Sequence, residues 1–157
     1  MYDIQPDCVR FQSANSRIPD FTFVYLPRTT VSSAIHLNYI GFHPEDPYKV
    51  AYLSTWMGNG GSLSYSEEKK FYIIDTSNTQ SIYSGSIKLS KNPDQTDDDF
   101  YNRNFSRTYV YEMDFSSIDK NGTYYIYIPN IGISETFQIN KDVWKKAFIK
   151  SARGLYH

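Results

Sequence analysis

The chain has little of the chemistry that metal and redox sites require. It contains one cysteine, Cys8, and three histidines, His36, His43 and His157. A single cysteine excludes an intrachain disulfide, and a zinc site would have to rely on histidine and carboxylate ligands almost alone. His36 falls in a predicted strand and His43 in a turn, so we interpret both as ordinary surface histidines. We therefore expect neither a metal nor a cofactor.

Excess charge of either sign and long apolar runs are also missing. The formal net charge is −1, from 16 Lys+Arg and 17 Asp+Glu, which gives no electrostatic reason to expect a nucleic acid or a membrane as partner. No apolar run approaches the roughly 20 residues of a membrane-spanning helix. The first residues lack the basic-then-apolar layout of a secretory signal. Either the protein stays inside the cell or the chain begins downstream of its own targeting segment.

Aromatic residues, by contrast, are abundant. The chain has 15 Tyr, 10 Phe and 2 Trp and is 17% aromatic. Aromatic and β-branched side chains fit the half-buried surface of a pleated sheet, and turn-forming residues separate the aromatic runs. The pattern predicts an all-β fold, an immunoglobulin-like β-sandwich of about seven strands. We place the seven strands of the sandwich at residues 35–42, 50–56, 71–75, 81–90 (with a kink at Gly85), 107–115, 122–129 and 132–139, and a further strand before it at residues 21–27.

The pattern changes to a helical one at the C-terminal end of the chain. Apolar and small residues recur there at helical spacing, with Asn140 or Asp142 placed as the N-cap. Two interpretations stay open. Trp144 and Phe148 contact a following domain, or the helix covers the sandwich's own core. The residues at helical spacing are Val143, Trp144, Ala147, Phe148, Ser151, Ala152 and Leu155.

A structural corner is predicted at the sequence IDKNGTYY. Ile118 would plug the core, Asn121 and Gly122 would form the turn with a positive φ at Gly122, and the hydroxyl of Tyr124 would bond to a backbone carbonyl. The residues after the corner alternate between the two faces of a strand. We expect Tyr124, Ile126 and Ile128 on the core side and Tyr125 and Tyr127 on the outer side.

Exposed aromatic rings are candidates for sugar contact, because the C–H face of a pyranose packs on an aromatic ring. The candidates are Trp56, Tyr125 and Tyr127, and Trp56 could form a strip with Tyr65 and Tyr72. Packing in the core and in loops is the interpretation we favour for that strip, since sequence does not separate exposed from buried rings.

Acidic side chains are numerous but do not form a recognisable catalytic pair. Asp94, Asp97, Asp98 and Asp99 could ligate calcium, yet they lack the spacing of a calcium loop and are interpreted as a solvated loop. We assign no catalytic residue. Asn104 and Asn121 begin formal N-glycosylation sequons.

Four groups of residues, in this order, resemble the N-terminal immunoglobulin-like domain of glycoside hydrolase family nine cellulases. The family pattern has an asparagine strand with a Gly-aromatic-x-Pro turn, then a Ser-Gly-x-Leu type strand, an Asp-Phe-Ser…Gly-Thr-Tyr stretch and a Ser-x-x-Phe-x-Ile ending. The matching residues are Asn38 with Gly41–Pro44, then Ser84, Gly85 and Leu89, then Asp114–Ser116 with Gly122–Tyr124, and last Ser134, Phe137 and Ile139. Tyr39 stands where glutamine is usual, Phe42 where tyrosine is usual, and residues 57–70 resemble an insertion.

The resemblance covers residues 34 to 157 and implies three parts. These are an N-terminal extension or linker (1–33), a sandwich (34–140) and the start of a helix (141–157) that leads into a catalytic (α/α)6 barrel of the same polypeptide. The implied role is a non-catalytic module that stabilises a barrel degrading β-1,4-glucan, in an extracellular endoglucanase-type hydrolase. The Asp-Ala-Gly-Asp motif of that family's catalytic domain is absent from this sequence. The alternative is a free-standing carbohydrate-binding or adhesion module.

Overall fold

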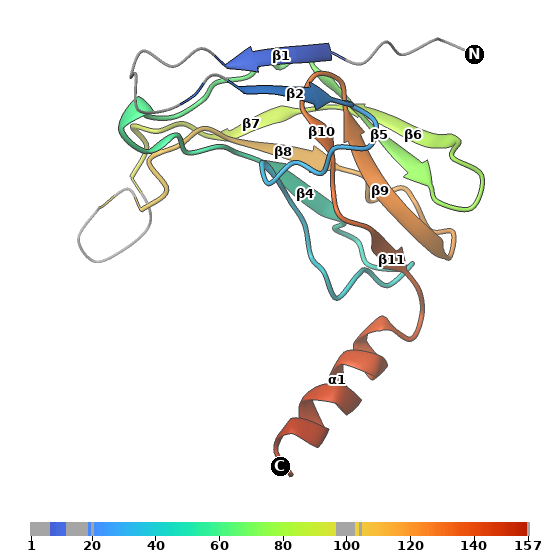
Figure 1. Cartoon of the computed structure of the whole chain (residues 1–157). Helices are drawn as coiled ribbons and strands as arrows, with labels where there is room; N and C mark the ends of the chain where they lie inside the picture. Colours follow the sequence, from blue (N-terminus) through green and yellow to red (C-terminus); the bar gives the residue numbers. More distant parts are fainter. Residues whose placement is uncertain (1–6, 12–18, 20, 97–102, 104, 157) are drawn as a thin grey trace.

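The computed structural model describes residues 7–11, 19, 21–96, 103 and 105–156. Two antiparallel sheets form the body of the molecule, with one helix at the C-terminal end (Figure 1). The predicted all-β sandwich with a C-terminal helix is therefore confirmed. The first sheet has the order β10–β9–β5–β6, with β11 also paired to β9, and the second has the order β3–β4–β8–β7.

The described part of the chain contains eleven strands, more than the predicted seven or so. The first sheet consists of β5 (Lys70–Asp75), β6 (Ser81–Ser86), β9 (Gly122–Ile128), β10 (Gly132–Ile133) and β11 (Phe137–Ile139). The second consists of β3 (Ile35–His36), β4 (Val50–Leu53), β7 (Lys88–Lys91) and β8 (Val110–Asp114). A separate hairpin pairs β1 (Asp7–Phe11) with β2 (Phe21–Tyr25), and the short helical elements are η1 (Gly58–Gly60) and α1 (Val143–Gly154).

The core lies between the two sheets and follows the period-2 pattern of the strands. Tyr124, Ile126 and Ile128 are fully buried on β9, as the alternation predicts. On β8, Tyr111 and Met113 face the same core from the other sheet. Three phenylalanines close one end of the core with edge-on and tilted ring contacts; they are Phe42, Phe115 and Phe137.

The chain changes sheets inside the predicted strand 81–90. β6 belongs to the first sheet and β7 to the second, and the buried side chain of Ile87 lies between them in the core. The change of sheet does not occur at Gly85, where we predicted a kink. Gly85 lies within β6, where a Cβ would come within 2.7 Å of the ring of Phe71. The break therefore occurs at Ile87, where the chain passes through the core from the first sheet to the second.

The predicted strand 35–42 is reduced to two residues because Asn38 forms a turn with its own side chain. Its amide donates to the carbonyl oxygen of Gly41 at 3.2 Å, and its Oδ1 accepts from the amide of Ile40 at 3.0 Å. Gly41 has φ of +104°, and a Cβ there would lie 2.5 Å from the carbonyl oxygen of Gln138. Glycine is therefore required where this turn meets the last strand.

The predicted strand 132–139 is likewise divided into β10 and β11. The residue between them that remains paired is Ser134, which is buried. Its Oγ accepts from the amide of Ile126 at 2.9 Å and donates to the carbonyl of Glu135 at 2.6 Å. These side-chain bonds replace part of the regular strand ladder.

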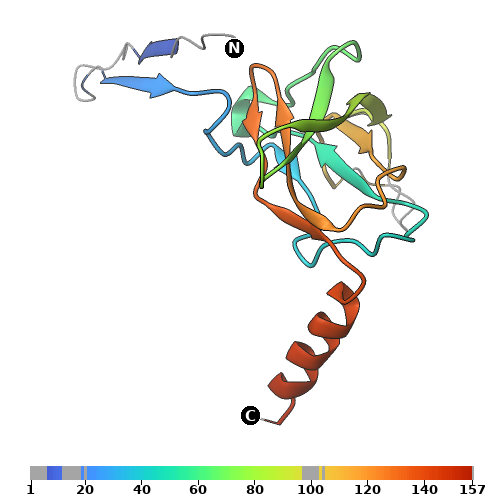
Figure 2. The same ribbon diagram turned by 90° about the vertical axis from the view of Figure 1, so that its right-hand side faces the viewer.

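Helix α1 extends away from the sandwich in both views (Figures 1 and 2). Val143, in its first turn, is its buried residue. Asp142 occupies the N-cap position without a side-chain cap bond, whereas Asn140 accepts the amide of Asp142 at 2.8 Å. The helix therefore does not cover the sandwich's own core.

Candidate functional site

The corner before β9 holds Tyr124 in place. The hydroxyl of Tyr124 donates to the carbonyl oxygen of Lys120 at 3.0 Å, and Ile118 is buried in the core. Gly122 does not have the positive φ that we predicted. Glycine is needed there for space, because a Cβ would lie 2.5 Å from the Tyr124 oxygen. Asn121 is exposed at the turn.

A carboxylate lies beside this corner at the end of β5. Asp75 accepts hydrogen bonds from the hydroxyl of Ser77 at 2.7 Å and from its amide at 2.9 Å. These bonds hold the pKa of Asp75 below its ordinary value. Burial, and then the charge of Asp75, raises the pKa of Tyr124.

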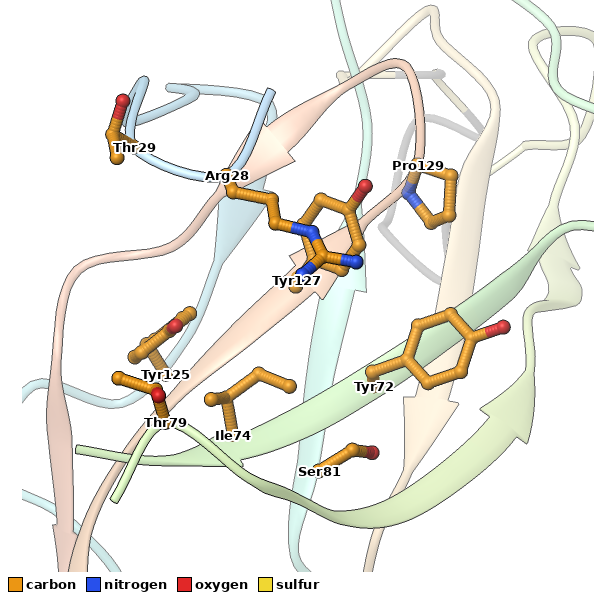
Figure 3. Close-up of a pocket in the computed structure, with 9 residues that line it drawn as sticks. All are labelled: Arg28, Thr29, Tyr72, Ile74, Thr79, Ser81, Tyr125, Tyr127 and Pro129. Carbon is orange, nitrogen blue, oxygen red and sulfur yellow. The ribbon is translucent and has the colours of Figure 1, made fainter. Parts of the chain in front are cut away.

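The opposite face of β9 carries Tyr125 and Tyr127 into an open hollow of about 640 Å³ (Figure 3). The neighbouring strand β5 contributes Tyr72, which pairs with Tyr127, and Ile74, which pairs with Tyr125. Because paired residues of adjacent strands point to the same face, the strand register places these four side chains together. Thr79, Ser81 and Pro129 complete the hollow together with Arg28 and Thr29.

The two rings nearest each other in the hollow are those of Tyr72 and Tyr127. Their centroids are 6.1 Å apart and their planes differ by 30°. The guanidinium carbon of Arg28 lies 5.6 Å from the Tyr127 centroid, in the range of a cation–π contact. Figure 3 shows the guanidinium across the Tyr127 ring and the ring of Tyr72 beside it.

Arg28 reaches the hollow from a turn that sequence analysis treated as linker. The amides of Thr29 and Thr30 both donate to the carbonyl oxygen of Leu26, at 2.9 and 2.8 Å. Residues 30–32 then run beside β10, where Ile133 donates to Thr30 and Ser32 donates to Ile133. No local motif marks Arg28, because its position depends on pairing with a strand about a hundred residues later in the chain.

The remaining aromatic candidates lie on other surfaces. Trp56 is 67% exposed on the loop that carries η1 and does not line the hollow. Tyr65 packs edge-on against Tyr111 at 5.7 Å, and its hydroxyl is 2.8 Å from Thr55 Oγ1. Trp56, Tyr65 and Tyr72 therefore do not form one strip.

A second surface surrounds the base of α1. Trp144 is 46% exposed and Phe148 is 72% exposed, although both are large and apolar. A shallow depression of about 300 Å³ lies between the sandwich and another side of the helix, lined in part by Tyr39, Ile40 and Ala147. We call Trp144, Phe148, Tyr39 and Ile40 the helix-base surface.

The described histidine candidates, His36 and His43, make separate local hydrogen bonds. His36 lies 3.3 Å from the carbonyl oxygen of Ser54, and His43 Nδ1 accepts the amide of Glu45 at 3.2 Å. Within residues 7–11, 19, 21–96, 103 and 105–156, no three His, Cys, Asp or Glu side chains cluster as metal ligands would. The acidic candidates Asp97, Asp98 and Asp99, the sequon residue Asn104 and the terminal His157 lie outside the described residues.

A buried lysine, Lys49, was not anticipated from the sequence. It is 1% exposed, and its Nζ donates to the carbonyl oxygens of Pro44 at 2.9 Å and Asp46 at 2.7 Å. It fixes the turn that follows Phe42.

Among the described residues, no helix is long and apolar enough to span a bilayer.

Comparison with known proteins finds similarity over most of the sandwich. Residues 30–132 match the family described as cellulase N-terminal ig-like domain. Endoglucanase D of Acetivibrio thermocellus is 30% identical over 124 residues, which cover 79% of this chain and 16% of that protein. The chain thus spans about one sixth of the curated relative it matches.

Solved structures share the fold. The glycoside hydrolase family 9 endoglucanase J30 superposes with a TM-score of 0.52 at 23% identity, over 72% of this chain and 17% of that one. A family 9 protein of Bacteroides ovatus gives a TM-score of 0.50 at 19% identity, over 72% and 16% of the two chains. The similarity covers only a small part of each of these proteins.

Proposed function

This chain belongs to the family of cellulase N-terminal immunoglobulin-like domains, and we propose that it is a non-catalytic module that supports the catalytic domain of a glycoside hydrolase. The partner is a catalytic (α/α)6 barrel of the same polypeptide, which hydrolyses β-1,4-glucan outside the cell. The module stabilises that barrel by burying apolar surface against it.

The helix-base surface is the observation that carries this proposal. Trp144 and Phe148 are exposed on a helix that leaves the sandwich after one anchored turn. These two residues are four apart, so they lie on one side of the helix. Exposed apolar side chains that gather in this way mark an interaction site. Tyr39 and Ile40 are also exposed and line a depression together with another side of the helix. We therefore expect a partner to contact the Asn38–Gly41 turn as well as the helix.

The experiment uses the polypeptide as its gene encodes it. Replacing Trp144 and Phe148 together by serine is expected to lower the melting temperature of the catalytic barrel by several degrees, because the contact between the domains is lost. The matched control replaces Trp56 by serine. Trp56 is also an exposed aromatic residue but lies outside the helix-base surface, so this change should leave the melting temperature unchanged.

Two results would overturn the proposal. One is a reading frame that ends at His157, which leaves no barrel to support. The other is release of reducing sugar from soluble cellulose by the purified 157-residue chain, which would make the module itself catalytic.

A further inference from the structure

We propose that the hollow between Arg28 and Tyr72 is a binding site for a neutral, hydroxyl-rich saccharide. The inference concerns this chain alone and stands apart from its proposed role in supporting a catalytic domain. The hollow lies on the outer face of the first sheet and is concave and open to solvent. Its volume of about 640 Å³ falls in the range of roughly 300–1,000 Å³ that is typical of small-ligand sites.

The aromatic part of the site consists of Tyr72, Tyr125 and Tyr127. The guanidinium of Arg28 lies 5.6 Å from the Tyr127 centroid, so it occupies one side of that ring. Tyr72 stands beside it with its plane tilted by 30°. The apolar C–H face of a pyranose can pack on such a ring, and we place the sugar on Tyr72.

The polar part of the site both donates and accepts hydrogen bonds. A guanidinium that stacks on a ring through its face keeps its edge N–H groups available as donors. The hydroxyls of Thr79 and Ser81 already donate to the carbonyls of Asn78 at 2.7 Å and Tyr83 at 3.2 Å. Each of these oxygens therefore presents its lone pairs to a ligand as an acceptor.

This combination selects the chemical class of the ligand. A sugar hydroxyl both donates and accepts hydrogen bonds. It can therefore accept from Arg28 and donate to the hydroxyl oxygens of Thr79 and Ser81. A carboxylate or phosphate could use Arg28 but would meet lone pairs at Thr79 and Ser81. Among the described residues that line the hollow, Arg28 is the only charged one. A neutral saccharide therefore fits the whole lining.

The site is held in place before any ligand arrives. Tyr72 and Tyr127 are paired across two hydrogen-bonded strands of the first sheet. The turn that carries Arg28 is closed by two backbone hydrogen bonds to Leu26. Preorganised aromatic and polar groups reduce the entropy lost on binding.

The test is a calorimetric titration of the purified chain with cellohexaose. The wild type is expected to bind saturably, and Arg28→Ala and Tyr72→Ala each to weaken binding about tenfold or more, as loss of a hydrogen bond to a charged group or of a ring contact does. Tyr72→Phe keeps the ring and retains affinity. Trp56→Ala, an exposed aromatic outside the hollow, leaves affinity unchanged.

Arg28 is exposed on a turn, so Arg28→Ala remains informative if Tyr72→Ala unfolds the sheet. Absence of saturable binding by the wild type at millimolar cellohexaose overturns the proposal. Loss of binding in Trp56→Ala but not in Arg28→Ala also overturns it, because the site then lies on the η1 loop. Tighter binding of oligogalacturonate than of cellohexaose overturns the assignment to a neutral ligand.

Discussion

The ring of Tyr124 lies so close to Gly122 that a Cβ at residue 122 would be 2.5 Å from the phenol oxygen and 2.6 Å from Cζ. Glycine at this corner thus makes room for the side chain two residues later. The same ring directs its hydroxyl to the carbonyl of Lys120. Lys120, Gly122 and Tyr124 thus depend on one another: the small Gly122 allows the Tyr124 ring to pack, and the packed ring can bond to Lys120.

We expect Gly122→Ala to destabilise the fold by about 1–3 kcal/mol, the usual cost of forcing extra atoms into a packed site. The new methyl group must displace Tyr124, which also weakens the bond to Lys120. Urea unfolding of the purified chain measures the effect. Gly154→Ala is the matched control, because no atom lies within 4 Å of a Cβ in the last turn of α1. That change should be neutral or stabilising by about 0.5–1 kcal/mol. Equal effects of the two substitutions would contradict this account.

Lys49→Met should cost about 2–5 kcal/mol of unfolding free energy. It removes two hydrogen bonds from a buried ammonium and leaves the carbonyls of Pro44 and Asp46 without their donor. Chemical denaturation gives the difference, and Lys70→Met on an exposed strand position serves as the control, expected within about 0.5 kcal/mol of wild type. A Lys49→Met variant as stable as the control would show that the turn does not depend on the ammonium.

The stability of the chain should depend on pH through Asp75. Its pKa is lowered in the folded state, first by the hydroxyl of Ser77 and then by the amide of Ser77. The resulting stabilisation is complete above the unfolded pKa of about 3.9 and is lost as the pH falls through the lower folded pKa.

Ser77→Ala removes the larger of these two causes. Its unfolding free energy should therefore lie below that of wild type at neutral pH and converge with it in acid, where Asp75 is protonated in both states. Denaturation curves between pH 7 and about pH 2 follow this convergence. In an Asp75→Asn background the serine substitution should have the same effect at every pH. A constant gap between wild type and Ser77→Ala would exclude the proposed linkage.

Within α1, the anchor and the exposed residues should respond differently to truncation. Val143 is 3% exposed, and Val143→Ala should cost about 1–2 kcal/mol through lost burial. Phe148→Ala, although it removes a larger side chain, should change the stability of the isolated chain by less than about 0.5 kcal/mol. Thermal unfolding of both variants separates the two cases. A large loss in Phe148→Ala would mean that the helix packs back on the sandwich in solution.

The sequence was informative where local pattern decides structure. Alternation alone placed Tyr124, Ile126 and Ile128 in the core, because a strand with one buried face repeats every two residues. It was less informative about strand ends. The break at Ile87 occurs where the chain must cross from one sheet to the other, a requirement that no local pattern expresses.

The candidate site shows the same division. Tyr125 and Tyr127 were expected on the outer face, and they lie there together with Tyr72, which the sequence placed in a different group. Arg28 could not be found, since its approach depends on pairing between residues 30–32 and β10. Lys49 could not be found either, because a lysine after a proline-rich turn is ordinarily exposed. Contacts between distant segments are what the sequence alone did not reveal.

The hydrogen bonds between β11 and Phe42, next to the Gly41 turn, affect how the fold responds to force. Phe42 forms a parallel bridge with Ile139, donating to Gln138 at 2.9 Å and accepting from Asn140 at 3.0 Å. Because β11 leads directly into α1, a pull on the helix draws β11 along its own length. The two bonds to Phe42 are then loaded in shear, together with those to β9, and must break together rather than one after another. Tension applied to the helix is therefore distributed over two distant parts of the chain, the Phe42 segment and β9.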